Sequence, residues 1–183
     1  MTAADIADIV ALSKRVVGPG YWTAESVRDT LARSTAGDVV CSHVVRDDAG
    51  VLLAFRFALP PGAWDQGRGD GLRMERWPFA LTEAAYFQSA WVAPQARGLG
   101  LGPAMARASL ADLARLGARG VVTHSWKESP RGSSRRYLER LDFRVVAEHA
   151  DYWINVDYTC SLDGRPCRCT ALEMVRTLTP ADT

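Results

Sequence analysis

Residues 91–102, Trp-Val-Ala-Pro-Gln-Ala-Arg-Gly-Leu-Gly-Leu-Gly, join an expected strand to an expected helix. The apolar run Ala84–Val92 predicts a strand, and Pro94 ends it because proline cannot donate to a ladder. Glycines then alternate with other residues, and a helical apolar pattern begins at Pro103. Glycine has no Cβ to hold a ligand away from the backbone, and a helix N-terminus supplies unpaired N–H groups and partial positive charge. The segment therefore predicts an anion site suited to phosphate.

The glycine pattern narrows the choice of phosphate ligand. No Gly-Lys-Ser/Thr follows, as a P-loop requires, and residues 120–122 are Gly-Val-Val where a dinucleotide fingerprint expects an acidic residue. The order of strand, Val-x-Pro, Arg-x-x-Gly-x-Gly and helix instead resembles the pyrophosphate loop of the GNAT acyltransferases, which binds coenzyme A. Arg97, Gly100 and Gly102 match the fixed positions of that motif, and Val92 matches the strand end before it. The alternative is a plain glycine-rich turn.

This resemblance implies a fold, a cosubstrate and a set of binding residues. The fold is α+β, of the three-layer α/β/α type, with a mixed, mostly antiparallel sheet, splayed central strands and helices on both faces. The cosubstrate is acetyl-CoA or another acyl-CoA, and the acceptor is an amine of a small molecule or peptide. A backbone N–H near Val92 is expected to hold the oxyanion. The residues expected to bind coenzyme A are Val92, Arg97, Gly98, Leu99, Gly100, Leu101 and Gly102.

Composition sets broad limits on the class of protein. The chain has 183 residues, of which 48% are hydrophobic and 23% charged, as in ordinary soluble globular proteins. A net charge of +1 gives no electrostatic case for nucleic acid or a membrane surface. We expect no signal peptide and no membrane span, and therefore a cytoplasmic protein with reduced cysteines, either a monomer or a homodimer.

Patterns elsewhere in the chain predict the order of elements implied by the resemblance. We expect one domain over residues 1–183, with a cysteine-containing insertion at about 154–170 between the last two strands. The polar segment 60–80 is interpreted as a loop on the acceptor side or as a solvated insertion. The expected elements are helices over 3–16 and 24–33, a hairpin of strands 38–46 and 51–59, a strand over 120–126, a helix from Ser133 or Ser134 through Leu141, and strands over 143–153 and 171–178.

The candidates for catalysis depart from the pattern of the family. Many GNAT enzymes carry a basic glutamate on the strand before the glycine loop, where this chain has Tyr86 and Gln88. His124, near the end of the next expected strand, is the candidate base, because histidine titrates near neutral pH. The alternative is a structural histidine that takes no part in chemistry.

Tyr137 is the candidate general acid. The segment 137–143 resembles the family's Tyr-Glu-Lys-Leu-Gly-Phe, whose tyrosine lies five residues before the phenylalanine and protonates the leaving thiolate. Five residues before Phe143 is Leu138, and one residue on a helix is a rotation of about 100°. Either the helix end is adjusted by one residue, or Tyr137 is not the acid. Asp142 replaces the family's glycine at a position that favours left-handed backbone.

Three cysteines, Cys160, Cys167 and Cys169, lie in the expected insertion. Their spacing allows a structural zinc site, for which His149, Asp163 or a partner chain would supply the fourth ligand. Reduced buried thiols and a disulfide are the alternatives. A nucleophilic cysteine would need a nearby base, and the sequence identifies none.

Two other functions are compatible with these departures. One is a non-catalytic module that binds acyl-CoA or regulates a partner. The other is an enzyme of the same fold with different acyl-CoA chemistry, such as decarboxylation.

Overall fold

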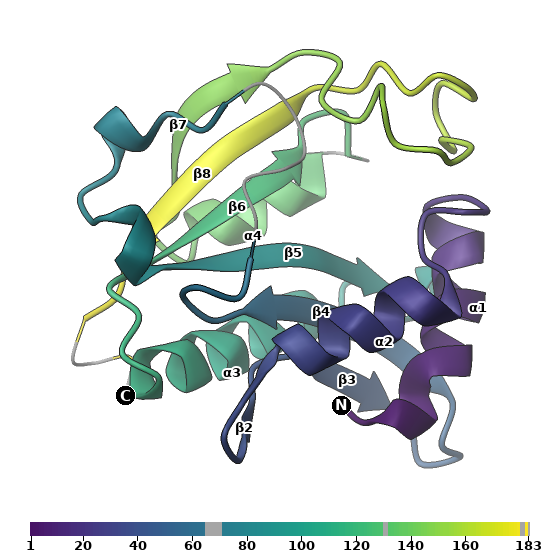
Figure 1. Ribbon diagram of the computed structural model, residues 1–183. Coiled ribbons are helices and arrows are strands. Elements are labelled where there is room, and N and C mark those ends of the chain that lie inside the picture. Colours follow the sequence, from purple (N-terminus) through teal and green to yellow (C-terminus); the bar gives the residue numbers. More distant parts are fainter. Residues whose placement is uncertain (65–70, 130–131, 180–181, 183) are drawn as a thin grey trace.

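A six-stranded sheet of order β3-β4-β5-β6-β8-β7 forms the centre of the computed structural model, which describes residues 1–64, 71–129, 132–179 and 182 (Figure 1). All neighbouring strands are antiparallel except β5 and β6, which are parallel. The mixed, mostly antiparallel sheet predicted from the sequence is therefore confirmed. The strands are β3 (His43–Arg46), β4 (Leu52–Leu59), β5 (Ala84–Val92), β6 (Gly120–Trp126), β7 (Arg144–His149) and β8 (Ala171–Thr177), and a separate pair is formed by β1 (Thr35–Ala36) and β2 (Val39–Val40).

Helices cover both faces of the sheet, as predicted. The helices α1 (Ile6–Val16) and α2 (Ala24–Arg33) lie on one face, and α3 (Leu101–Arg115) and α4 (Ser133–Glu139) lie on the other (Figure 1). Strand β4 separates two cores, because alternate side chains of a strand point to opposite faces. Its phenylalanines pack with α1, while Ala58 packs with α3. Short 3-10 helices cover Ala3–Asp5, Met74–Arg76, Leu81–Glu83 and Pro94–Ala96.

Several element ends differ from the sequence prediction. The serine cap predicted for α4 is wrong: Gly132 stands at the N-cap with φ +63°, and the helix ends at Glu139, before the predicted Leu141. The strand predicted over 143–153 ends at His149, followed by turns in which Asp151 has a positive φ. The left-handed backbone predicted at Asp142 is confirmed, with φ +62°.

The segment between β4 and β5 packs against the sheet where the structure describes it. Trp77 is buried, and the indole Nε1–H of Trp64 donates to the carbonyl of Ala84 at 2.7 Å. Residues 65–70 of the loop predicted over 60–80, and residues 130–131 shortly before α4, lie outside the described residues. The two tryptophans therefore pack this segment over one face of strands β5 to β8.

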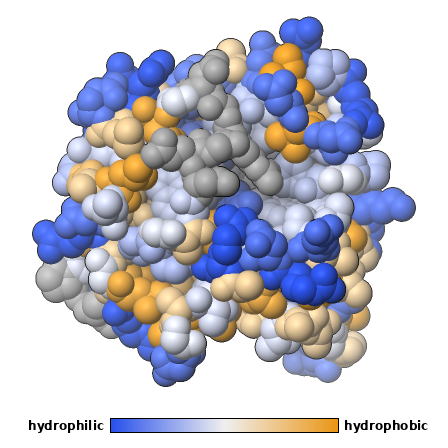
Figure 2. Space-filling view, in the orientation of Figure 1, coloured by the Kyte–Doolittle hydropathy of each residue, from blue (hydrophilic) through white to orange (hydrophobic). Residues whose placement is uncertain are grey.

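The surface mixes side chains of both kinds. Figure 2 shows hydrophilic and hydrophobic residues interspersed over the face that carries α1 and α2. Among the described residues, none of the helices has the length and apolar character needed to cross a bilayer.

Candidate active site

The central strands β5 and β6 separate halfway along their length. They pair from Ala84 opposite Gly120 to Phe87 opposite Thr123, and the ladder ends there. The register of β5 against β4 also shifts at this point, since Phe57 lies opposite Ser89 and Ala58 opposite Phe87. This register leaves one extra residue on β5, which forms a β-bulge. Such bulges bend strands and are frequent beside active sites. The splayed strands implied by the resemblance are therefore present.

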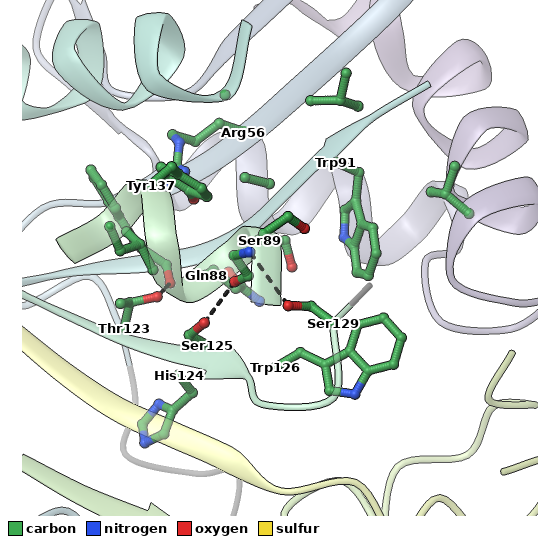
Figure 3. A pocket seen from close by; sticks show the side chains of 18 of the residues that line it. Arg56, Gln88, Ser89, Trp91, Thr123, His124, Ser125, Trp126, Ser129 and Tyr137 are labelled. Carbon is green, nitrogen blue, oxygen red and sulfur yellow. Dashed lines mark hydrogen bonds between the residues drawn. The ribbon is translucent and has the colours of Figure 1, made fainter. Parts of the chain in front are cut away.

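A cavity of about 970 Å³ occupies this gap. Its lining includes Tyr137 and the glycine loop from the α3 and α4 side of the sheet, and Trp64, Tyr86 and Tyr152 from the other side. A volume of this size is at the upper end of typical small-molecule sites. The cavity thus brings residues of both faces of the sheet to one space (Figure 3).

The glycine loop has the conformation that its sequence predicts. Gly98 and Gly100 have φ values of +85° and +77°, and Gly100 is the N-cap of α3. A Cβ placed at either glycine or at Gly102 would meet no atom within 4 Å, so the space in front of this backbone is open. Five predicted loop residues line the cavity, namely Arg97, Gly98, Gly100, Leu101 and Gly102, whereas Leu99 is 67% exposed and is not among the lining residues.

Val92 presents its backbone amide to the same gap. The N–H of Ala93 donates to the carbonyl of Leu53 on the β4 side at 2.8 Å. Because successive N–H groups of a strand point to opposite edges, the Val92 N–H points away from β4 and toward the splayed side. Buried polar atoms of the cavity also lack partners among the described residues, including Arg56 Nε, Gln88 Oε1 and Trp91 Nε1. The lining therefore fits a ligand with polar groups, such as the amide-bearing arm of coenzyme A.

Tyr137 lies in the cavity beside a buried cation. Arg56 donates from Nη2 to the Tyr137 hydroxyl at 2.5 Å, and its guanidinium lies 4.2 Å from the centre of the Phe87 ring (Figure 3). Arg56 is only 1% exposed. Because the arginine donates to the phenol oxygen, the phenol proton remains available to a group in the cavity.

The offset of one residue in the segment 137–143 has a local explanation. Helix α4 ends early, and the N–H of Phe143 returns to the carbonyl of Leu138 at 3.1 Å through the left-handed Asp142. Leu138 packs in the core and is 2% exposed. This helix end turns Tyr137, and not Leu138, toward the arginine in the cavity.

His124 lies on the opposite face of the sheet from Tyr137, in a chain of buried polar groups. Its Nδ1 is 2.9 Å from the Tyr86 hydroxyl, and its ring stacks on Tyr152 with 4.4 Å between centroids. Next to it, Nε2 of His149 is 2.7 Å from a carboxylate oxygen of Glu173. The other oxygen of Glu173 accepts a 2.7 Å bond from the indole of Trp77.

Burial governs the charge of His124. Desolvation, together with the nearby His149, lowers the pKa of His124 to about 3. The imidazole is therefore neutral at pH 7, and Nδ1 can accept the Tyr86 hydroxyl proton. His149 was a candidate zinc ligand from the sequence, but its Nε2 contacts Glu173.

Arg56, which lines the cavity, and Glu173, which is buried behind it and contacts His149, were both missed by sequence reasoning. Arg56 stands in the apolar run Leu-Leu-Ala-Phe-Arg-Phe-Ala-Leu, and Glu173 in Ala-Leu-Glu-Met-Val. A single charged residue inside a buried strand is itself a signal, because charged side chains are almost never fully buried without a partner.

The three cysteines of the predicted insertion lie together with Asp163. One ligand atom from each of these four residues lies within 4.8 Å of the others, and the three thiols are buried. His149 does not belong to this cluster.

Comparison with known proteins gives matches among solved structures. No family model matches the chain, and no curated protein does. A GCN5-related N-acetyltransferase from Kribbella flavida superposes with a TM-score of 0.64 and 20% identity, covering 97% of this chain and 95% of that chain. The chain has the GNAT fold.

Two further structures with the GNAT fold are similar. A phosphinothricin acetyltransferase from Sinorhizobium meliloti in complex with acetyl-CoA has a TM-score of 0.67 at 18% identity, over 97% of this chain and 85% of that chain. A ribosomal-protein-alanine N-acetyltransferase from Brucella melitensis has a TM-score of 0.66 at 14% identity, over 97% of both chains. The fold predicted from the glycine loop is thus confirmed.

Proposed function

We propose that the protein is an acyl-CoA-dependent N-acyltransferase that moves an acetyl or other acyl group to an amine of a small molecule or peptide. One observation carries the proposal: a single cavity joins the glycine loop before α3 to Tyr137 and, through the gap between β5 and β6, to Tyr86 and His124. The acetyl-CoA complex of the Sinorhizobium enzyme supports the choice of cosubstrate.

The donor side holds the acyl-CoA by its phosphates and its thioester. Backbone N–H groups at the start of α3 would bind the pyrophosphate, and Arg97 adds positive charge beside them. The Val92 N–H, which points into the gap, would donate to the thioester oxygen and stabilise the negative charge that develops there.

The leaving group departs on the α4 side of the sheet. When the carbon–sulfur bond breaks, the Tyr137 hydroxyl gives its proton to the sulfur of coenzyme A. Arg56, bonded to the same oxygen, stabilises the negative charge that remains on the phenol. Free coenzyme A is then released as a thiol, and solvent returns the proton to Tyr137.

The acceptor amine enters on the opposite face. Its nitrogen attacks the thioester carbon, and its proton passes to the Tyr86 oxygen while the Tyr86 proton moves to Nδ1 of His124. The low pKa of His124 makes this protonation transient, so the proton is readily returned to solvent.

Aromatic rings surround this entrance and favour an amine on an apolar or aromatic body. Trp64 stacks on Tyr86 with ring centroids 4.8 Å apart, and Tyr152 covers His124. Aromatic faces also attract the cationic form of an amine before it loses its proton.

Thiol release tests the proposal directly. The purified protein is incubated with acetyl-CoA and a panel of small-molecule amines and peptides with free N-termini, and free thiol is measured against time. We expect amine-dependent release with at least one acceptor, and a product heavier by the acyl group. Coenzyme A binding by calorimetry without release from any acceptor would indicate a non-catalytic module. Loss of carbon dioxide from malonyl-CoA without an amine would indicate decarboxylation.

A further inference from the structure

The segment between β7 and β8 holds three cysteine thiols and one carboxylate at close range. Sγ of Cys160 is 3.8 Å from Sγ of Cys169, and the Cys169 sulfur is 3.1 Å from Oδ2 of Asp163. The third sulfur belongs to Cys167, and ligand atoms from all four residues lie within 4.8 Å of one another. The cysteines are 7%, 1% and 3% exposed, in chain order.

The backbone around Cys160 forms a tight hairpin that orients the Cys160 sulfur toward the other two cysteines. The Cys160 N–H donates to the Gly164 carbonyl at 2.8 Å, and the Gly164 N–H returns to the Cys160 carbonyl at 3.0 Å. Gly164 has φ +76°, which this turn requires and which glycine adopts without strain. Within the hairpin, the N–H of Leu162 points at the Cys160 sulfur at 3.4 Å. Cys160 and Asp163 are separated by two residues, the spacing of paired zinc ligands on such turns.

The separation of the Cys160 and Cys169 sulfurs matches that of two ligands of one metal ion and is longer than a disulfide bond. Zinc–sulfur bonds of about 2.3 Å at tetrahedral angles place two sulfurs about 3.8 Å apart. A disulfide requires a sulfur–sulfur distance of about 2.05 Å. The separation of Cys160 and Cys169 is the coordination distance.

Hydrogen bonds from neighbouring groups support ligation. The Tyr158 hydroxyl donates to the Cys167 sulfur at 3.0 Å, and the backbone N–H of Arg168 donates to the Asp163 carboxylate at 3.0 Å. Such bonds orient ligands and offset the negative charge of thiolates around a metal.

We propose that Cys160, Asp163, Cys167 and Cys169 bind a structural zinc ion. The site closes the segment 151–170 on itself and fixes it against the loop between α1 and α2. In that contact the Ser161 N–H donates to the Val17 carbonyl, and a Cβ on Gly18 would lie 1.9 Å from the Thr159 oxygen. Trp153 and Ser161 from the same segment line the central cavity, so the zinc would hold one wall of that cavity in place. This inference does not depend on the proposed acyl transfer.

Metal content of the full chain tests the site. The protein is purified without chelator from cells supplied with zinc, and zinc is measured by elemental analysis against protein concentration. We expect about one zinc per chain, and a lower melting temperature after chelation, because a structural metal contributes directly to folding. Cys41 provides a matched control: it is a fully buried cysteine in the other core, so Cys41→Ala should keep the zinc while Cys169→Ser loses it.

A second pair of variants keeps the test decisive if Cys169→Ser does not fold. Asp163 is exposed, so its replacement leaves the core intact. Asp163→Ala should weaken zinc binding at least tenfold in a competition assay, and Asp163→Cys should restore it. Cobalt substitution should give the visible absorption of a tetrahedral thiolate site in the parent and in Asp163→Cys. Three results would each overturn the proposal. They are a zinc content below about 0.1 per chain in the parent, equal zinc contents in the Cys41 and Cys169 variants, and an intact mass of the parent that is two hydrogens low, as a disulfide would give.

Discussion

Replacing Tyr137 with phenylalanine removes one oxygen atom from the cavity and leaves the ring in place. That oxygen accepts the Arg56 hydrogen bond at 2.5 Å, and Arg56 is 1% exposed, so the substitution removes a hydrogen bond from a buried charged donor. An unsatisfied buried donor costs about 1–3 kcal/mol of stability. Loss of a general acid costs about 10²–10⁴-fold in rate, equivalent to about 3–5 kcal/mol in the barrier. The two effects are separable, because one changes the melting temperature and the other changes turnover of the folded enzyme.

The assay measures kcat and KM by thiol release, coenzyme A affinity by calorimetry, and stability by thermal unfolding. For Tyr137→Phe we expect kcat and kcat/KM to fall together by at least 100-fold with coenzyme A affinity nearly unchanged, the pattern of an interaction made only in the transition state. Leu138→Ala is the neighbouring control, since it should lose about 2–5 kcal/mol of stability through a core cavity. Its turnover, measured below its melting temperature, should remain near that of the parent. A Tyr137→Phe enzyme that turns over like the parent would refute the assignment.

The remaining predictions concern the glycine loop and the buried histidine. Gly100→Val should lower coenzyme A affinity at least tenfold by calorimetry, since a branched side chain would stand where the phosphates approach. Gly50→Val is the control: Gly50 has a similar φ of +80° and also faces open space, so the variant should be equally strained yet bind coenzyme A normally. The pKa of His124 is lowered to about 3 in the folded protein, so the unfolded chain binds more protons below its ordinary value of 6.5. His124 should therefore lower the free energy of unfolding by up to about 1.4 kcal/mol for each pH unit between pH 6.5 and pH 3 as the pH falls. Urea titrations at several pH values should show a shallower fall of this free energy in His124→Gln than in the parent.

Local sequence patterns correctly predicted the helices and strands that have a clear residue signal at each end. The expected helix over 24–33 and strands over 84–92 and 120–126 have the predicted bounds. Each has a strong periodic or apolar pattern with a clear break at its ends, such as Thr23, which caps α2 by accepting from the Ser26 N–H. The pattern at the start of α4 was weaker: the serines there suggested a cap, but a left-handed glycine occupies that position.

The parts of the site that sequence could not supply depend on contacts between distant segments. Arg56 and Tyr137 are 81 residues apart, and Trp77 and Glu173 are 96 apart, so no spacing rule relates them. The bulge in β5 arises from its register with β4, which a single strand does not reveal. Asp163 was one of several possible partners for the cysteines, and only the hairpin that ends at Gly164 selects it.

The two ends of the cavity are therefore built in different ways, and this difference bears on specificity. The proposed coenzyme A end uses residues of one continuous segment, 92–102, so a short motif predicts it. The proposed acceptor end uses side chains from several segments, among them Trp64, Tyr86, His124 and Tyr152. Under the proposed function, a change in any one of these segments should alter the acceptor without disturbing coenzyme A binding. If the proposed reaction is right, the segments around β5, β6 and β7 select the amine, and the proposed zinc site would fix the segment after β7, which carries Tyr152.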